Sequence, residues 1–216
     1  MIREDCDIRT PEGLRAALDR IAEADPRVAR ALVRVGYPEP RVRPPGFATL
    51  LRIIVAQQLS TASAAAIWRR LEERLGGQVE PEAALGLGED EVCAVGFSRR
   101  KWTYARTLAE AVASGRLDPD GLARLPEEEA VRRLVGLPGF GRWSAEIYLL
   151  FALGRADVFP AGDLALRVAF ARLAGLDSRP DEQSLRTHVE PWRPLRGAGA
   201  IFLWHLYGAA TLDGGR

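Results

Sequence analysis

The sequence of 216 residues predicts an all-α protein. In most segments apolar residues recur three and four positions apart, which is the spacing of one face of an α-helix. A serine, threonine or aspartate precedes several of these segments and a glycine follows several of them, as at helix caps. No segment shows a convincing alternation of apolar and polar residues, which a half-buried strand would need, and there is no repeat of solenoid period.

The first two helices are expected to begin at Pro11 and Pro26. Thr10 is placed to cap the first one, and proline suits the first helical position because the N–H that it lacks would have no partner there. Residues 36–46, GYPEPRVRPPG, contain four prolines. A rigid linker is therefore expected after the second helix.

Residues 47–77 are expected to form two helices separated by a break at residues 57–59, QQL. Ser60 or Thr61 caps the second of them. Residues 98–115 predict an amphipathic helix that a serine precedes and a glycine ends. The remaining helical segments are shorter or less regular, and they cover residues 81–96, 118–139, 141–154, 163–176, 181–192 and 194–212.

Composition excludes several classes of protein. The formal net charge is +1, so a nucleic-acid site must come from the local placement of charges and backbone amides. Hydrophobic residues make up 47% of the chain, yet no apolar run reaches the roughly 20 residues that span a bilayer. The first residues, MIREDCDIRTPEG, carry charges where a signal peptide is apolar. We expect a cytoplasmic protein, nucleoid-associated if bacterial, without membrane contact.

Residues that bind transition metals are scarce. Cys6 and Cys93 are the only cysteines, and His188 and His205 are the only histidines. Two cysteines are too few for a disulfide framework, a Cys₄ zinc site or a four-cysteine iron–sulfur cluster. We therefore expect no iron–sulfur cluster and no required cofactor.

Residues 134–145, LVGLPGFGRWSA, have the pattern of a helix–hairpin–helix. Gly139 and Gly141 permit positive φ and leave backbone N–H groups uncovered, so that a phosphate oxygen can approach them. The N-terminus of the following helix adds the positive end of its dipole. We expect Phe140 to turn inward and Arg142 to add a charge, which would hold a DNA backbone without reading its sequence. A plain helix–helix turn would use the same residues.

Asp163 opens a helix twenty-two residues after Gly141. An aspartate at such a position most often caps the helix. A helix–hairpin–helix with an aspartate at this distance also resembles the helix–hairpin–helix DNA glycosylase superfamily. Three segments, FATLLRIIVAQQLS, GRWSA and PWRPLRGAGAIFLW, resemble its 3-methyladenine DNA glycosylase II family. The resemblance spans residues 44–211, and we expect the compact form without the N-terminal β-rich domain of larger bacterial members.

The resemblance implies a fold of two helical lobes that flank a cleft for DNA and the flipped base. We expect residues 1–216 to form a single glycosylase unit. Its central lobe would span residues 37–155, with the hairpin at 134–146. Its second lobe would combine residues 1–36 and 156–216.

The resemblance also assigns roles around the scissile bond. Asp163 would be the catalytic carboxylate. The base pocket would be lined by Trp143, Trp204, Ile147, Leu164 and His205. An indole face attracts a cationic alkylated base by about 0.5 to 2 kcal/mol. The last three pocket residues stand where family members often have tyrosines, which leaves the substrate range open.

Further positions would contact DNA. The hairpin would do so through Gly139, Phe140, Gly141 and Arg142. Either Gln58 or Leu59 would fill the gap left by the flipped nucleotide, with Gln58 favoured as the plug, Leu59 as the adjacent wedge, and Ser60 in the same loop. The resemblance implies a structural Na⁺ or K⁺ at the hairpin, bound by the backbone carbonyls of Val135, Leu137 and Phe140.

These features predict a monofunctional DNA glycosylase that removes alkylated purines, such as 3-methyladenine and 7-methylguanine, from double-stranded DNA. The base must leave the stack before its N-glycosidic bond can be hydrolysed. Asp163 would stabilise the positive charge that develops on the deoxyribose. Alkylated bases leave as neutral molecules, so no strong general acid is needed. The protein would act as a monomer and leave an abasic site.

Strand cleavage is not expected. Bifunctional relatives use a lysine of the hairpin helix as a Schiff-base nucleophile, and this chain has Trp143 there. Lys101 is the only lysine, and with Arg99 and Arg100 it forms either a solvated basic face or a secondary phosphate contact. Two alternatives stay open: a monofunctional glycosylase for uracil, hypoxanthine or mismatched bases, and a non-catalytic helix–hairpin–helix DNA-binding module.

Overall fold

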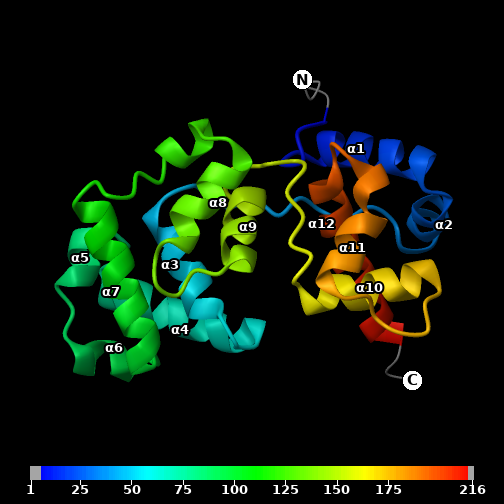
Figure 1. The fold of residues 1–216 in the computed structure, drawn as a ribbon. Coiled ribbons are helices and arrows are strands. Elements are labelled where there is room, and N and C mark those ends of the chain that lie inside the picture. Colours follow the sequence, from blue (N-terminus) through cyan, green and yellow to red (C-terminus); the bar gives the residue numbers. More distant parts are fainter. Residues whose placement is uncertain (1–5, 214–216) are drawn as a thin grey trace. The chain divides into compact units, whose positions relative to one another are not determined.

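The computed structural model describes residues 6–213, and within that range it contains helices and no strand (Figure 1). The all-α prediction is therefore confirmed. The α-helices are α1 (Pro11–Ala24), α2 (Pro26–Val35), α3 (Phe47–Ala56), α4 (Thr61–Arg74), α5 (Pro81–Leu85), α6 (Glu89–Val95), α7 (Arg99–Ala113), α8 (Glu127–Val135), α9 (Arg142–Phe151), α10 (Leu164–Ala174), α11 (Glu182–His188) and α12 (Arg196–Asp213). The 3₁₀ helices include η2 (Gly121–Arg124) and η3 (Glu190–Trp192). In this described range, no helix is both long enough and apolar enough to cross a membrane.

The helices begin where the local signals place them. α1 and α2 start at the two expected prolines. The Thr10 hydroxyl accepts a hydrogen bond from the Gly13 N–H at 3.1 Å, and the hydroxyls of Ser60 and Ser98 cap α4 and α7 in the same way. These predictions are confirmed. Local sequence was sufficient for them, because a cap depends on residues within one turn of each other.

The chain divides into two compact units. The first unit joins Met1–Val42 to Leu149–Arg216, and the second unit is Arg43–Tyr148. The segment after α2 belongs to the first unit as far as Val42, and within it the Tyr37 hydroxyl donates to the Asp19 carboxylate of α1. The sequence instead predicts boundaries between the lobes after residues 36 and 155. The boundaries between the units of the structure lie after Val42 and after Tyr148.

The first unit packs α1 and α2 against α10 and α12, and α11 packs on α10, so both ends of the chain contribute to it (Figure 1). Its most buried side chains include Leu14, Leu18, Phe170, Trp192 and Phe202. The indole N–H of Trp192 donates to the buried Asp25 carboxylate at 3.0 Å, and Asp25 also accepts from Arg27 at 2.8 Å. Burial would raise the pKa of Asp25, but these hydrogen bonds outweigh it and the pKa is lowered.

The second unit is built around α3. This helix is apolar on most sides, and its buried residues include Phe47, Leu50, Leu51, Ile54 and Val55. Such a helix is stable only inside a core, and α3 contacts both α4 and α7. The Gly46 N–H donates to the Tyr148 hydroxyl at 2.9 Å, which ties the start of α3 to α9.

Candidate functional site

The predicted hairpin joins α8 to α9. Gly139 has a φ of +88°, a left-handed conformation that glycine adopts without strain. A Cβ at this position would lie 2.5 Å from the ring of Tyr104. Phe140 is 5% exposed, so its ring packs inside the unit. The packing of the protein itself therefore requires a glycine at position 139.

Gly141 differs, because a Cβ there would meet no atom within 4 Å. The Gly141 carbonyl accepts a hydrogen bond from the Ala145 N–H at 3.1 Å, so Gly141 stands directly before the first turn of α9. The first N–H groups of a helix have no partner within it, and they carry the positive end of its dipole. An anion can approach this end of α9 over Gly141 without meeting a side chain at that position.

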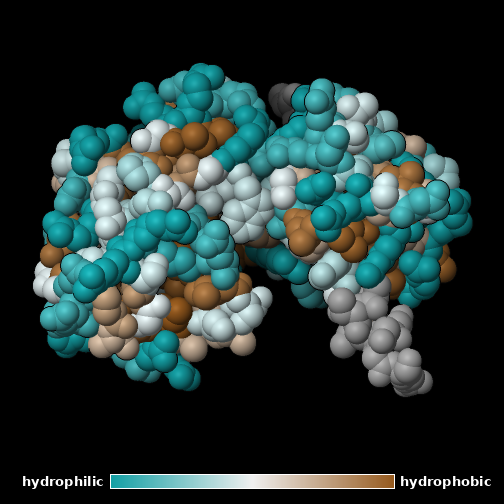
Figure 2. All heavy atoms as spheres, turned by 60° about the horizontal axis from the view of Figure 1, so that its bottom comes forward, coloured by the Kyte–Doolittle hydropathy of each residue, from teal (hydrophilic) through white to brown (hydrophobic). Residues whose placement is uncertain are grey.

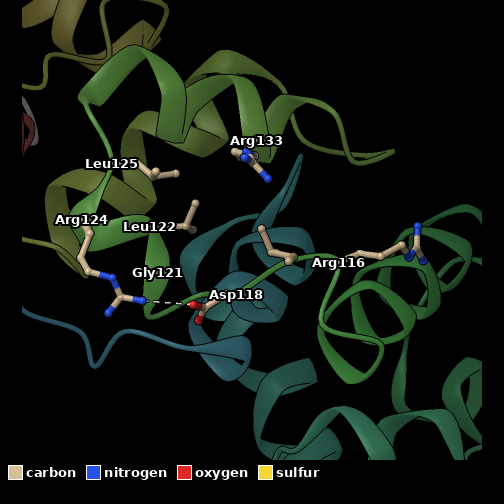
Figure 3. Close-up of a pocket in the computed structure, with 8 residues that line it drawn as sticks. Arg116, Asp118, Gly121, Leu122, Arg124, Leu125 and Arg133 are labelled. Carbon is tan, nitrogen blue, oxygen red and sulfur yellow. Dashed lines mark hydrogen bonds and ion pairs between the residues drawn. The ribbon is translucent and has the colours of Figure 1, made fainter.

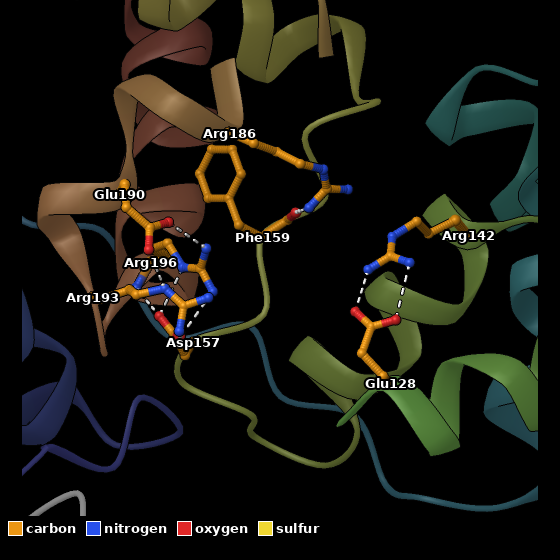
Figure 4. A network of polar contacts seen from close by, with 8 residues as sticks. All are labelled: Glu128, Arg142, Asp157, Phe159, Arg186, Glu190, Arg193 and Arg196. Carbon is orange, nitrogen blue, oxygen red and sulfur yellow. Dashed lines mark hydrogen bonds and ion pairs between the residues drawn. The ribbon is translucent and has the colours of Figure 1, made fainter. Parts of the chain in front are cut away.

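Arg142 binds two carboxylates of the protein. Its Nη2 lies 2.5 Å from Glu128 Oε1, its Nη1 lies 3.2 Å from Glu128 Oε2 (Figure 4), and its Nε lies 3.0 Å from Oε1 of the buried Glu146. The hydrogen bonds that Arg142 donates to Glu128 are the main reason that the pKa of Arg142 is raised. The sequence predicts that Arg142 adds a charge to the DNA surface. In the structure its charge is balanced within the protein, where it links α8 to α9.

The break between α3 and α4 presents the loop residues that are predicted to contact DNA. Gln58, Leu59 and Ser60 are all exposed. Gln58 has a φ of +57°, and it is the one non-glycine residue with positive φ in the part of the chain that the structure describes. A side chain seldom adopts this conformation unless its surroundings hold it there.

Gln57 joins this loop to the hairpin, a role that sequence reasoning did not assign. Its Nε2 donates to the Gly139 carbonyl at 2.7 Å and to the Ser144 hydroxyl at 3.2 Å. The Lys101 ammonium donates to the carbonyls of Val55 at 2.7 Å and Gln57 at 2.6 Å. The only local sequence signal for this contact is the pair of glutamines, Gln57 and Gln58, in the break. The sequence does not show which of the two side chains points into the protein.

Asp163 stands at the N-cap of α10 in the first unit. Its Oδ1 accepts one hydrogen bond from the Leu166 N–H at 3.1 Å and another from the Trp204 indole N–H at 3.2 Å. Its side chain is partly exposed. Asp163 therefore caps its helix and is also oriented by an aromatic residue of α12.

Trp204 contacts two further side chains. The ring of Phe151 lies 5.4 Å away between centroids, tilted by 40°. The Arg41 guanidinium lies 5.5 Å from the indole centroid, within the range of a cation–π interaction. Desolvation lowers the pKa of Arg41, and the negative charge of Asp163 opposes that shift. Arg41 belongs to this cluster, and sequence reasoning missed it because a proline-rich linker offers no pattern that would single it out.

The predicted base-pocket residues are divided between the two units. Trp143 and Ile147 lie on α9 in the second unit, one turn apart on the same face, and both are partly exposed. Leu164, Trp204 and His205 lie in the first unit. Leu164, the residue that follows Asp163 in the sequence, is 55% exposed, so its apolar side chain is accessible to a ligand.

His205 is held by the backbone. Its Nε2 lies 2.8 Å from the Val35 carbonyl at the end of α2. A carbonyl only accepts hydrogen bonds, so Nε2 carries a proton in this contact. The negative end of the α2 dipole favours a donor at this place.

The visible surface is mostly hydrophilic, with apolar residues in separate patches (Figure 2). Three predicted site residues, Leu59, Val135 and Leu164, are among the exposed large apolar side chains. Among the residues that the structure describes, no group of three or more His, Cys, Asp or Glu side chains is placed to hold a metal ion.

One cavity in the second unit contains none of the predicted site residues. It has a volume of about 250 Å³ and is lined by Arg116, Leu117, Asp118, Gly121, Leu122, Arg124, Leu125 and Arg133. Figure 3 shows Arg124 reaching the Asp118 carboxylate at this cavity, a distance of 3.4 Å. The cavity is therefore separate from the predicted pocket.

Known DNA repair proteins match the chain over most of its length. Residues 51–194 match the HhH-GPD superfamily base excision DNA repair protein family. DNA-3-methyladenine glycosylase 1 of Schizosaccharomyces pombe is 36% identical over 158 residues, which are 72% of this chain and 69% of that protein. DNA-3-methyladenine glycosylase 2 of Escherichia coli is 25% identical over 203 residues, which are 86% of this chain and 68% of that protein.

Solved structures agree with these matches. The 3-methyladenine DNA glycosylase of S. pombe, in complex with abasic DNA, superimposes with a TM-score of 0.82 at 32% identity and covers 91% of this chain and 97% of its own. DNA-3-methyladenine glycosidase of Bacillus halodurans superimposes with a TM-score of 0.79 at 30% identity, and the match covers 91% of each chain. The chain therefore belongs to the HhH-GPD superfamily of base excision DNA repair proteins, and within it to the 3-methyladenine DNA glycosylase family.

Proposed function

We propose that this protein flips alkylated purines, of the 3-methyladenine and 7-methylguanine type, out of double-stranded DNA and hydrolyses their N-glycosidic bonds. The observation that carries the proposal is the contact between Asp163 and Trp204, in which an indole N–H orients a carboxylate at a helix N-terminus. The names of two relatives refer to 3-methyladenine, which supports the substrate class.

The proposed chemistry uses Asp163 as a fixed negative charge. As the N-glycosidic bond breaks, positive charge develops on the deoxyribose, and a preorganised carboxylate stabilises it without having to reorient. The Leu166 N–H and the Trp204 indole N–H supply that preorganisation through Oδ1. The same carboxylate would orient the attacking water. A cationic purine leaves as a neutral molecule, so no second acid is required.

Trp204 supports the preference for cationic bases. Its ring already has a cation beside it, because Arg41 lies over the indole. An alkylated purine cation would compete with Arg41 for the attraction of the ring, which contributes about 0.5 to 2 kcal/mol. Uracil and hypoxanthine are neutral and would gain no such attraction.

The hairpin and the Gln58–Ser60 loop would contact the DNA itself. The open side of Gly141 would admit a phosphate oxygen to the N-terminus of α9. Gln58, with Leu59 beside it, would fill the gap left by the flipped nucleotide. The protein would act as a monomer, in the compartment that holds the cell's DNA.

The hairpin carbonyls suit a structural Na⁺ or K⁺, because carbonyl oxygens are ligands that hard cations take. Val135, Leu137 and Phe140 would hold it. The Leu137 carbonyl accepts a hydrogen bond from the Phe140 N–H at 3.1 Å, and its second lone pair can still bind a cation. The bound ion would add one positive charge at the hairpin. No cofactor is required for the hydrolysis.

The expected product is an intact strand with an abasic site. A lyase forms an imine at the sugar C1′ and needs an amine there, which in the bifunctional relatives is a lysine. The hairpin helix has Trp143 at the corresponding position, and the Lys101 ammonium is bound by two backbone carbonyls. Trapping with borohydride on damaged duplex should therefore give no cross-link, and nicks should appear only after alkali.

Duplexes that each carry one lesion test the substrate class. We expect release of 3-methyladenine and 7-methylguanine. Release of uracil, hypoxanthine or mismatched adenine in place of the alkylated purines would favour the other glycosylase activity. Binding without release of any base would favour a non-catalytic DNA-binding module.

Asp163→Asn tests the carboxylate. Excision should fall by about 10²- to 10³-fold, as when one preorganised group is removed, while DNA binding stays within error. Asp181→Asn is the matched control, because the Asp181 carboxylate caps α11 in the same unit by accepting from the Ser184 N–H at 2.7 Å. An equal loss in both variants would show that Asp163 acts only as a helix cap.

A further inference from the structure

We infer that Lys101 is a positioning residue, which locks the Gln57–Ser60 loop to the DNA-binding hairpin so that both meet the duplex as one rigid element. This inference rests on the proposed function, because it takes the exposed tip of the loop as the part that enters the duplex. It assigns the only lysine of the chain to base extrusion rather than to chemistry.

The Lys101 ammonium closes the C-terminal end of α3. It donates to the carbonyls of Val55 at 2.7 Å and Gln57 at 2.6 Å. The last carbonyls of a helix lack partners within the helix, and they carry the negative end of its dipole. Hydrogen bonds from a charged donor are about twice as strong as neutral ones. The loop therefore leaves α3 from a fixed point.

A lysine suits this place better than the arginines used elsewhere in the chain. An ammonium is a compact group whose three donors can turn toward two separate carbonyls, whereas a guanidinium is a planar fork. Desolvation lowers the pKa of Lys101, and the neighbouring charge of Arg100 lowers it further. Its hydrogen bonds to two backbone carbonyls hold the ammonium against the protein, whereas Arg99 and Arg100 are exposed.

The side chain of Gln57 makes the second connection. Both donors of its amide are used, one on the Gly139 carbonyl at 2.7 Å and one on the Ser144 hydroxyl at 3.2 Å. Ser144 is 4% exposed, so one partner of this contact is buried. Lys101 thus fixes the backbone of Gln57, and Gln57 fixes the hairpin.

The geometry of Gln58 explains why such a connection is useful. Its φ of +57° needs support from its surroundings, and the carbonyl directly before it is one of the two that Lys101 binds. The exposed tip that follows, Gln58 to Ser60, is thereby aimed by the same element that would anchor the phosphates. A loop that moved independently would yield when pushed against stacked bases.

Fluorescence of 2-aminopurine tests loop insertion without any catalysis. The probe duplex carries a stable tetrahydrofuran abasic analogue with 2-aminopurine opposite it. Lys101→Met keeps the aliphatic stem and removes the donors, and Gln57→Leu removes the amide. Arg100→Met is the matched control, because it removes a charge from the adjacent position on the same helix. Thermal unfolding of each variant shows whether it is folded.

We expect Lys101→Met and Gln57→Leu to bind undamaged duplex within about twofold of the wild type and to lose most of the 2-aminopurine response. When the lesion is paired with a base, single-turnover excision should slow by about tenfold or more, as for the loss of a charge-assisted hydrogen bond. The defect should shrink when the lesion lies opposite an abasic site, where extrusion costs less. The double variant should be no worse than the poorer single one, because both act on one connection.

Three results would overturn the inference. The first is an unchanged 2-aminopurine response in folded Lys101→Met. The second is a loss that Arg100→Met shares, together with a salt-dependence slope lower by about 0.9, which would make Lys101 a phosphate contact. The third is an excision defect that does not depend on how the lesion is paired. If the wild type releases no base but its 2-aminopurine response depends on Lys101, the proposed function fails and this inference stands.

Discussion

The indole N–H of Trp204 donates to the Asp163 carboxylate at 3.2 Å, and the two residues lie 41 positions apart in the sequence. Asp163 begins α10 and Trp204 belongs to α12, so the packing of these two helices sets the orientation of the carboxylate. The proposed catalytic group therefore depends on a residue whose position only the folded unit determines.

Trp204→Phe should slow excision without weakening DNA binding. Phenylalanine keeps an aromatic face and removes the donor, and a hydrogen bond to a charged group contributes about 1.5 to 3 kcal/mol. Single-turnover excision is therefore expected to fall by about tenfold or more. Trp192→Phe is the control, because its indole N–H donates to Asp25 in the same unit. That variant should be less stable but excise normally, and equal excision losses would contradict the role of Trp204.

Serine substitutions at the two hairpin glycines should have different effects. Gly139→Ser should lower the free energy of unfolding by about 1 to 3 kcal/mol, because φ is positive there and the Tyr104 ring occupies the Cβ position. Gly141→Ser should leave stability unchanged, because serine is a good N-cap and its Cβ meets nothing. It should weaken binding to damaged and undamaged duplexes equally. If the affinity of Gly141→Ser for DNA were unchanged, the hairpin would be only a turn between two helices and not a DNA contact.

Arg142→Gln should affect stability rather than the electrostatics of DNA binding. Glu146 is 3% exposed, and the loss of its hydrogen bond from Arg142 should lower the free energy of unfolding by about 1.5 to 3 kcal/mol, as for other hydrogen bonds to charged groups. Denaturation by urea measures that loss. The slope of log affinity against log salt should stay constant, since a lost phosphate contact would lower it by about 0.9. A lower slope would show that Arg142 exchanges Glu128 for DNA.

The stability of the first unit should fall in acid because of Asp25. Its pKa is lowered in the folded state, so its contribution to stability is fully present above the unfolded value of about 3.9. It is lost as the pH falls through the lower, folded pKa. Urea unfolding at a series of pH values below about 5 measures this effect. Asp25→Asn should flatten the decline, and an unaltered pH dependence would refute the assignment.

Local sequence determined the helices and their starts. The Thr10, Ser60 and Ser98 caps lie within one turn of the N–H groups that they bind, so the residues that decide them are adjacent in the chain. Gly139 and Gly141 likewise mark a hairpin, and the order of the motifs indicates the family, because both depend on residue types at short spacing.

Tertiary structure alone decided which side chains meet. Gln57 reaches Gly139 across 82 positions, and Lys101 reaches Gln57 across 44. The sequence predicts that Arg142 adds a positive charge to the surface, but this charge is balanced in the structure because α8 places the Glu128 carboxylate against it. Hydrogen bonds and ion pairs depend on distances of a few ångströms, and helix periodicity does not specify how separate helices pack. The sequence therefore singled out Asp163, whose catalytic role stays a prediction, whereas the packing of the helices showed what orients its carboxylate and what connects the loop to the hairpin.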